Sequence, residues 1–185
     1  MRKSSGFTLV ELIIVVVIVA VVAAITIPNF RPLIQDNRLT ADANNVVEGL
    51  NLALVEALRC TCQVTMCKSN DGLTCVNDSS GNGWEAGWIV FRDNGVLGEF
   101  DATDGDTLIR AFELNSSELT LRVGGTIEDY ISYNARGQPR SRHGGLLAVS
   151  DTFRLCDDRG SAKARAIVLN NVGRIKIKTE TASCP

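Results

Sequence analysis

A long apolar stretch near the N-terminus constrains this chain more than any other feature. The 21 residues from Phe7 to Ile27 contain one ionisable side chain, Glu11. A helix of this length spans about 30 Å, which is the thickness of the hydrocarbon core of a bilayer. Arg2 and Lys3 precede the stretch and no further base occurs before Arg31. We therefore expect the N-terminus to stay in the cytoplasm and the remainder to be exported.

A cleaved secretory signal or a simple membrane anchor is the plainer interpretation of the same stretch, because Ala20, Ala23 and Ala24 could supply a small-residue cleavage site. Glu11 argues against it. An unpaired carboxylate inside a bilayer costs about 3 kcal/mol or more, so a carboxylate in this position indicates a function. The ordinary alternative is that Glu11 lies near the lipid headgroups.

The segment GFTLVEL, from Gly6 to Leu12, resembles the class III leader of type IV pilins and type II secretion pseudopilins. The resemblance also covers the short basic leader before Gly6 and Pro28 at the end of the apolar run. It implies that residues 1–6 are a leader, which a prepilin peptidase removes between Gly6 and Phe7 on the cytoplasmic side. It also implies methylation of the new amine of Phe7, so the apolar helix is kept.

The resemblance assigns a role to Glu11 as well. A carboxylate in the apolar core of a filament needs a cationic partner, and the family uses the N-terminal amine of an adjacent subunit. Glu11 is therefore the predicted assembly residue.

After Pro28 and Pro32 the sequence becomes amphipathic, with apolar residues at intervals of three and four that predict a helical stripe facing a core. These residues are Leu39, Ala43, Val46, Val47, Leu50, Leu54, Ala57 and Leu58. We expect one helix from Phe7 to about Leu58, with residues 7–28 as a transmembrane or filament-core half and residues 29–58 as the amphipathic half. Proline lacks an amide hydrogen, so a kink or local break is expected at both prolines.

Beyond Arg59 the helical period disappears, and runs of β-branched and aromatic residues alternate with Gly, Asn and Asp. The runs that predict strands are 63–66, 87–92, 107–112, 119–123, 130–134, 152–155, 166–169 and 174–178. Residues 59–185 are thus predicted to form a β-rich head. A chain of 185 residues has room for one such domain plus an appendage.

The phrase WEAGWIVFRD, residues 84–93, resembles the GspH/FimT branch of these proteins. So do the Leu155-Cys156-Asp157 strand end and the Gly173-Arg174 element. The resemblance implies an α+β, pilin-like fold in which the long helix packs on an antiparallel β-sandwich. Trp84, Trp88 and Phe91 are expected to be core aromatics.

The six cysteines favour disulfides if the head is exported. Cys67 and Cys75 flank a polar segment with an Asp-Gly turn, which predicts a hairpin closed by a disulfide. A bridge from Cys156 to Cys184 would pin the C-terminal tail, and the resemblance implies such a C-terminal bridge.

Cys60 and Cys62 depart from the GspH/FimT pattern. They could pair with each other, but residues two apart in a strand lie nearly 7 Å apart, at the limit for a disulfide. Six cysteines allow 15 connectivities. A zinc site formed by Cys60, Cys62, Cys67 and Cys75 is a further alternative, which export and the lack of a C-x-x-C spacing disfavour.

The sequence offers little for catalysis. The one histidine, His143, lies in the loop-like segment RSRHGG with no acid close in sequence, and no P-loop, G-x-G-x-x-G or H-E-x-x-H motif occurs. Asp101, Asp104 and Asp106 suggest calcium only weakly, because their spacing does not fit an EF-hand loop. We therefore expect no catalytic residues, no metal, no cofactor and no enzymatic activity. An anchored, exported enzyme dependent on His143 or a cysteine is the competing class.

Charge is distributed unevenly along the chain. Residues 7–135 contain 7 bases and 17 acids, whereas residues 136–185 contain 10 bases and 4 acids. Within the basic part, a strand would place Arg174, Lys176 and Lys178 on one face, where they could bind phosphates without reading bases. This stripe resembles the GRxR element of DNA-uptake pilins of the branch, with lysine at the second basic position.

Arg136, Arg140 and Arg142 could extend the basic stripe if their loop folds nearby. The alternative is that these cations face the acidic part of this chain or of a neighbouring pilin.

These features together predict a minor pilin in a type IV pilus initiation or tip complex. It would be a single-pass inner-membrane protein with a periplasmic head. Its partners would be other minor pilins, the major pilin, the prepilin peptidase and the inner-membrane assembly platform. A GspH-type pseudopilin of a type II secretion system and a DNA-binding competence pilin are the alternatives.

Overall fold

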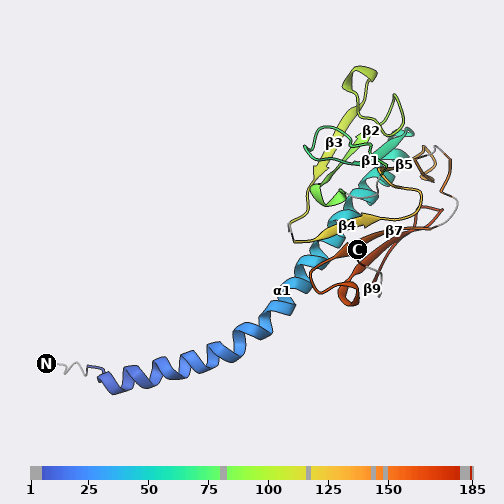
Figure 1. The fold of residues 1–185 in the computed structure, drawn as a ribbon. Helices are drawn as coiled ribbons and strands as arrows, with labels where there is room; N and C mark the ends of the chain where they lie inside the picture. The colour runs from blue at the N-terminus through green and yellow to red at the C-terminus, as the bar shows by residue number, and fades with distance from the viewer. Residues whose placement is uncertain are drawn as a thin grey trace. The chain divides into compact units, whose positions relative to one another are not determined.

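The computed structural model describes residues 6–79, 83–115, 118–142, 145–147, 150–179 and 184, without the side chains of residues 27–29. Leader residues 1–5 and His143 lie outside these ranges. The chain divides into two compact units, residues 1–37 and residues 38–185. One helix, α1 (Leu9–Cys60), begins in the first unit and ends in the second (Figure 1).

Helix α1 starts and ends within two residues of the predicted boundaries. Of the kink or local break expected at Pro28 and Pro32, the local break is not formed, since residues 27–36 are helical throughout. Each proline removes one backbone donor, and the hydrogen bonds of the neighbouring turns are enough to keep the helix continuous.

The part of α1 in the second unit presents one fully buried stripe to the head: Leu39, Ala43, Val46, Leu50, Ala53 and Ala57. The alternating steps of four and three keep these residues on one helical face. Leu58, which was predicted to lie in this stripe, is 51% exposed. It follows Ala57 by one residue, so it is rotated by about 100° from the buried face.

The described part of the head contains nine strands in two antiparallel sheets (Figure 1). The five-stranded sheet has the order β3 (Thr107–Phe112), β2 (Trp88–Arg92), β1 (Val64–Lys68), β5 (Tyr130–Tyr133), β6 (Pro139–Arg140). The four-stranded sheet has the order β4 (Thr120–Val123), β7 (Asp151–Cys156), β8 (Arg165–Leu169), β9 (Ile175–Thr179). Three short 3-10 helices lie between strands: η1 (Trp84–Ala86), η2 (Ala102–Asp104) and η3 (Ser161–Lys163). Every predicted run overlaps a strand, whereas β6 was missed because two residues are too few to show alternation.

One hydrophobic core joins α1 to both sheets. Leu50 from the helix, Val90 and Ile131 from the five-stranded sheet, and Phe153 and Ile167 from the four-stranded sheet all belong to it. The head is therefore a single folding unit in which the helix is a structural layer.

The predicted core aromatics are buried. Trp84 and Trp88 lie in the main core, and Phe91 lies in a smaller cluster with Cys67 and Ile89. Neighbours in β2 thus face opposite sides, and the five-stranded sheet is covered on both faces.

Gly49 sets the distance between α1 and the five-stranded sheet. A β-carbon at this position would lie 2.6 Å from the indole nitrogen of Trp88 and 3.3 Å from the sulfur of Met66. Glycine is disfavoured inside helices, but here the lack of a side chain lets the helix backbone approach β1 and β2 closely.

Three disulfides account for all six cysteines. Cys67–Cys75 and Cys156–Cys184 are the predicted pairs. The third pair is Cys60–Cys62, so the zinc alternative is wrong, because all four of its ligands are consumed in disulfides. The expected strand spacing does not apply to Cys60 and Cys62. Cys60 ends α1 and Thr61 is left-handed (φ 54°), so the Cα atoms are 5.1 Å apart.

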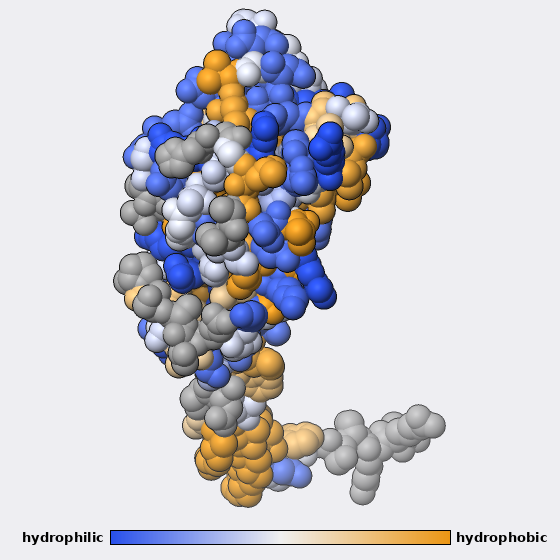
Figure 2. Space-filling view, turned by 90° about the vertical axis from the view of Figure 1, so that its right-hand side faces the viewer, coloured by the Kyte–Doolittle hydropathy of each residue, from blue (hydrophilic) through white to orange (hydrophobic). Residues whose placement is uncertain are grey.

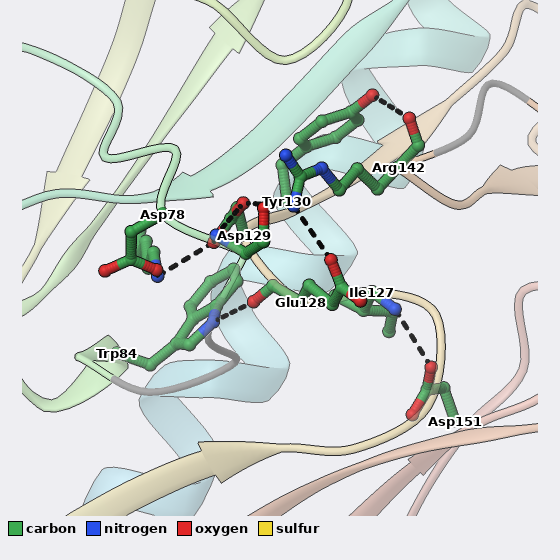
Figure 3. A network of polar contacts seen from close by, with 10 residues as sticks. Asp78, Trp84, Ile127, Glu128, Asp129, Tyr130, Arg142 and Asp151 are labelled. Carbon is green, nitrogen blue, oxygen red and sulfur yellow. Dashed lines mark hydrogen bonds and ion pairs between the residues drawn. The ribbon is translucent and has the colours of Figure 1, made fainter.

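A buried charged network joins loops of the head (Figure 3). At its centre, Asp129 is fully buried and its carboxylate lies 2.8 Å from the ammonium group of Lys68, whose side chain is 1% exposed. Lys68 also contacts Asp78. The backbone amide of Ser79 donates to both carboxylate oxygens of Asp129, at 3.0 and 2.8 Å. The network therefore ties β1 to the segments before η1 and before β5.

Arg142 and Trp84 extend this network. The Arg142 guanidinium lies 2.8 Å from Glu128 and 3.1 Å from Asp129. The Trp84 indole donates to the backbone carbonyl of Glu128 at 2.7 Å (Figure 3). The hydrogen bond to Glu128 raises the pKa of Arg142.

Candidate functional site

The first candidate surface is the N-terminal part of α1. The segment Leu9–Thr26 is long and apolar enough to cross a membrane. Its large apolar side chains, from Leu9 to Ile25, are each more than half exposed, and Figure 2 shows a contiguous hydrophobic surface on the helix. An apolar surface of this extent requires lipid or other protein around it.

Glu11 closes the N-terminus of α1. The backbone amide of Glu11 donates to the Thr8 hydroxyl at 3.3 Å, and a Glu11 carboxylate oxygen accepts from the Thr8 amide at 3.4 Å. This reciprocal arrangement is a capping box. This second role was not predicted, although the T-x-x-E spacing at the start of an apolar helix is its signature.

The predicted cleavage position is open. A β-carbon on Gly6 would meet no atom within 4 Å, and Phe7 is 78% exposed. Packing among the residues that the structure describes therefore does not require glycine at position 6.

The second candidate surface is one face of the four-stranded sheet, here called the basic sheet face and defined by Arg154, Arg174, Lys176 and Lys178. Lys178 lies opposite Ala166, and Ala166 lies opposite Arg154. In the same way, Lys176 lies opposite Val168, and Val168 lies opposite Thr152. Cross-strand neighbours share a face, so β9 places its two lysines on the same side as Arg154 of β7.

The opposite face carries the core. Phe153, Ile167 and Ile177 form one cross-strand row. Phe153 and Ile167 are fully buried, whereas Ile177 is 42% exposed at the sheet edge. The alternation predicted for residues 174–178 is therefore present.

A pocket of about 230 Å³ lies on the basic sheet face. It is lined by Ser150, Val168, Asn170, Arg174, Lys176 and Lys178. The three cations predicted as a stripe thus share one concave surface, and hydroxyl and amide groups beside them could donate to an anion.

The three arginines predicted to extend the stripe, Arg136, Arg140 and Arg142, lie in two different places. Gly173 lies against the Arg136 turn, since its β-carbon would be 3.1 Å from the carbonyl oxygen of Gly137. Arg136 is exposed in that turn and Arg140 is half-buried in β6. Arg142 is wrongly assigned to the stripe, because Glu128 and Asp129 already hold it in the buried network.

Sequence reasoning missed Arg154. Its guanidinium lies over Gly124, whose β-carbon would be 2.8 Å from an Arg154 terminal nitrogen. The signal was present, because alternation along residues 152–155 places Arg154 on the face opposite Phe153. The basic sheet face therefore spans three strands rather than one.

The acidic residues near η2 act locally. Asp101 accepts from the Thr103 amide at 2.8 Å and caps η2, and Asp106 accepts from the Asn94 amide at 2.7 Å. Over the ranges that the structure describes, no cluster of three or more metal-ligating side chains occurs.

Comparison with known proteins identifies the N-terminal segment and the family of the head. A family model for type II transport protein GspH matches residues 42–173, and a model for the prokaryotic N-terminal methylation motif matches residues 1–27. No curated protein matches the sequence.

The fold is similar to two crystal structures of the type IV minor pilin FimU of Pseudomonas aeruginosa strain PAO1. The first has a TM-score of 0.60 at 16% identity, covering 83% of this chain and 97% of the other. The second has a TM-score of 0.57 at 15% identity, covering 79% and 97%.

The methylation motif and the exposed apolar helix indicate processing by a prepilin peptidase and anchoring in the inner membrane, with the head in the periplasm. The GspH model covers most of the chain, from the middle of α1 to the turn before β9. This protein therefore belongs to the type II transport protein GspH family of pilin-like proteins.

Proposed function

We propose that the chain is a minor pilin, cleaved after Gly6, methylated on Phe7 and incorporated through α1 into the initiation or tip complex of a type IV pilus. It acts by interaction and not by turnover. The observation that supports this most is the exposed apolar surface from Leu9 to Ile25, which carries one carboxylate, Glu11. Its partners in this proposal are other minor pilins, the major pilin and the inner-membrane assembly platform.

In the assembled filament, the Glu11 carboxylate pairs with the N-terminal amine of an adjacent subunit. A charge in an apolar environment needs such a partner. In the same proposal, Gly6 is glycine because the peptidase requires it, since the described part of the chain leaves room for a side chain there.

Glu11→Gln and Thr8→Val separate the assembly role of Glu11 from its capping role. Glutamine keeps the capping box but removes the charge, so Glu11→Gln is expected to be processed and to stay out of sheared filaments. Thr8→Val removes the cap, at about 1 kcal/mol, but keeps the charge, so it is expected to be incorporated. Intact-mass spectrometry reports processing, and immunoblots of sheared filaments report incorporation.

Gly6→Val completes this experiment, because a branched side chain at the cleavage position is expected to leave residues 1–6 attached. A mature protein that still carries Met1, or one cut after Ala20, would contradict the proposal. Incorporation of Glu11→Gln at the wild-type level would show that assembly does not need the ion pair between Glu11 and the neighbouring amine. Recovery in secretion-system fractions alone would favour the GspH-type pseudopilin.

A second candidate function, DNA binding for uptake, is favoured by the pocket that Arg174, Lys176 and Lys178 line. Three cations on one concave surface can hold a phosphate backbone without reading bases. The Arg136 turn beside Gly173 would lengthen the contact.

Removal of these three charges tests DNA binding. In gel-shift titrations of the detergent-solubilised chain with duplex DNA, alanine at 174, 176 and 178 is expected to weaken binding equally for unrelated sequences. The slope of log K against log salt should fall by about 0.9 for each lost phosphate contact. A variant with alanine at Arg38 and Arg110, exposed arginines outside the basic sheet face, is the control. No binding by the wild type at low salt would eliminate this function.

A further inference from the structure

We propose that Cys60–Cys62 is a thiol–disulfide exchange site, which a periplasmic dithiol opens while the other two disulfides of the head stay closed. The bridge lies at the end of α1, where the chain turns into β1. Neither the family nor the assembly function proposed above accounts for a disulfide between cysteines two positions apart.

The three disulfides differ in access to their sulfurs. Cys60 and Cys62 are both partly exposed, and Thr61 between them is exposed. The other two bridges each have one buried half, Cys67 at 0% and Cys156 at 3% exposure. Exchange needs one sulfur that a thiolate can reach and a second that can leave as a thiolate.

A buried cysteine is a poor leaving group, because an apolar environment raises the pKa of its thiol. Cys67 lies in the small cluster with Ile89, Phe91 and Tyr130, so attack on Cys75 would expel a thiolate into that cluster. Attack on Cys184 would expel a thiolate at buried Cys156 in the same way. Cys60–Cys62 is therefore the bridge that can open at the surface.

The backbone of this bridge adds a second reason. Thr61 is a β-branched residue in the left-handed region, with φ of 54°, a conformation that such residues rarely adopt. The bridge also closes the shortest loop of the three, and a short loop restricts the unfolded chain least. The hydrogen bond from the Cys62 amide to the Ala57 carbonyl, at 3.3 Å, also holds Thr61 in this conformation. Opening the bridge thus removes one of two constraints on Thr61 and gives up little cross-linking.

The position of the helix end sets the direction of exchange. Cys60 is the last residue of α1, and its sulfur lies 3.8 Å from the carbonyl oxygen of Ala57. The negative end of the helix dipole disfavours a thiolate at Cys60, whereas Cys62 lies beyond the helix. Cys62 is therefore the leaving group, and the incoming thiolate attacks the Cys60 sulfur.

The exchange has two steps. One thiolate of the dithiol forms a bond to the Cys60 sulfur, the Cys60–Cys62 bond breaks, and Cys62 leaves as a thiolate that takes a proton from water. The second thiolate of the dithiol then attacks the dithiol sulfur that is bonded to Cys60. The bond to Cys60 breaks, and Cys60 leaves as a thiolate that is protonated in turn. Two electrons pass to the protein, and the dithiol becomes a disulfide.

The head is expected to stay folded when this bridge opens, because other contacts hold the end of α1. The buried carboxylate of Glu56 accepts from Arg59 at 2.7 Å and from Arg92 of β2 at 2.9 Å. The hydrogen bond from Arg59, and then that from Arg92, lower the pKa of Glu56 to about 2. The helix end thus remains tied to the five-stranded sheet, and the change is confined to the turn.

Differential alkylation tests the proposal. The oxidised full-length protein in detergent is titrated with dithiothreitol at neutral pH without denaturant, and free thiols are alkylated and identified by tandem mass spectrometry. Trypsin cuts after Arg59 and Lys68, so peptide 60–68 reports Cys60, Cys62 and Cys67 together. We expect Cys60 and Cys62 to be labelled at a dithiol concentration about tenfold or more below that for the other four, a difference of about 30 mV. Simultaneous opening of all three bridges, or later opening of this one, would overturn the proposal.

Two variants accompany this titration. Thr61→Gly removes the cost of the left-handed conformation, so Cys60–Cys62 should then need an about threefold higher dithiol concentration, with the other bridges unchanged. An unchanged midpoint would contradict the strain argument. Replacing both Cys60 and Cys62 with serine should abolish the early labelling step and leave the later two steps in place. Earlier opening of the remaining bridges would show that this disulfide is structural.

Discussion

Replacing Asp129 with alanine is expected to lower the free energy of unfolding by about 3–5 kcal/mol, the usual cost of breaking a buried ion pair. The substitution leaves the Lys68 ammonium group, which is 1% exposed, with Asp78 as its remaining carboxylate among the contacts described above. It also removes the acceptor of the Ser79 amide. For a chain of this length the melting temperature should fall by about 10 °C.

Circular dichroism during thermal unfolding of the full chain in detergent measures this loss. Asp104→Ala is the matched control, because Asp104 is exposed and its replacement should change stability by less than about 0.5 kcal/mol. Adding Lys68→Met to Asp129→Ala should restore part of the stability, since a hydrophobic residue of similar volume often replaces a buried charge without loss. A loss below about 1 kcal/mol for Asp129→Ala would show that the ion pair is not the main constraint.

Trp84→Ala is expected to cost about 3–5 kcal/mol as well, for a different reason. The indole is fully buried and packs edge-to-face on Phe153, with ring centroids 5.2 Å apart. Its nitrogen donates to the Glu128 carbonyl at 2.7 Å. Alanine would leave a cavity between η1 and the four-stranded sheet and an unpaired carbonyl in the turn that precedes Asp129.

Trp84→Phe separates the two contributions, because it keeps most of the packing and loses the hydrogen bond, at about 1–3 kcal/mol. Leu73→Ala is the control, since Leu73 is 61% exposed. Denaturant unfolding followed by circular dichroism suits both variants. Equal losses for alanine and phenylalanine would assign the whole effect to the hydrogen bond. Because Glu128 and Asp129 are adjacent, the double variant with Asp129→Ala should lose less than the sum.

Much of the fold follows from patterns within short segments. Strands such as β3 and β9 were predicted from alternation and turn residues, and the first half of α1 from its unbroken hydrophobicity. The single long helix was predicted too, but the lack of a local break at Pro28 and Pro32 was not, because the hydrogen bonds of neighbouring turns compensate for a lost donor. The pairing of Cys60 with Cys62 was not decided from the sequence. It depends on the left-handed conformation of Thr61, and a threonine gives no sequence signal for that conformation.

The buried network shows the limit of sequence reasoning more clearly. Lys68, Asp129 and Arg142 are far apart in sequence, and each is of a residue type that is usually exposed. Arg142 was therefore grouped with its sequence neighbours Arg136 and Arg140, whereas its partners in space are carboxylates. Arg154 was missed because it is far from Lys178 in sequence. The two residues share a face only because β7 and β9 both pair with β8.

The Thr8–Glu11 capping box alters how subunit addition should be pictured. In the free protein the Glu11 carboxylate already accepts weak hydrogen bonds from the Thr8 amide and hydroxyl, each at 3.4 Å. Engagement by a neighbour's amine would exchange that contact for a stronger one, while the Thr8 hydroxyl could continue to accept from the Glu11 amide. Docking would then exchange the hydrogen-bond partners of the Glu11 carboxylate at the start of the helix. The free-energy cost would be small, and the first turn would not need to unwind.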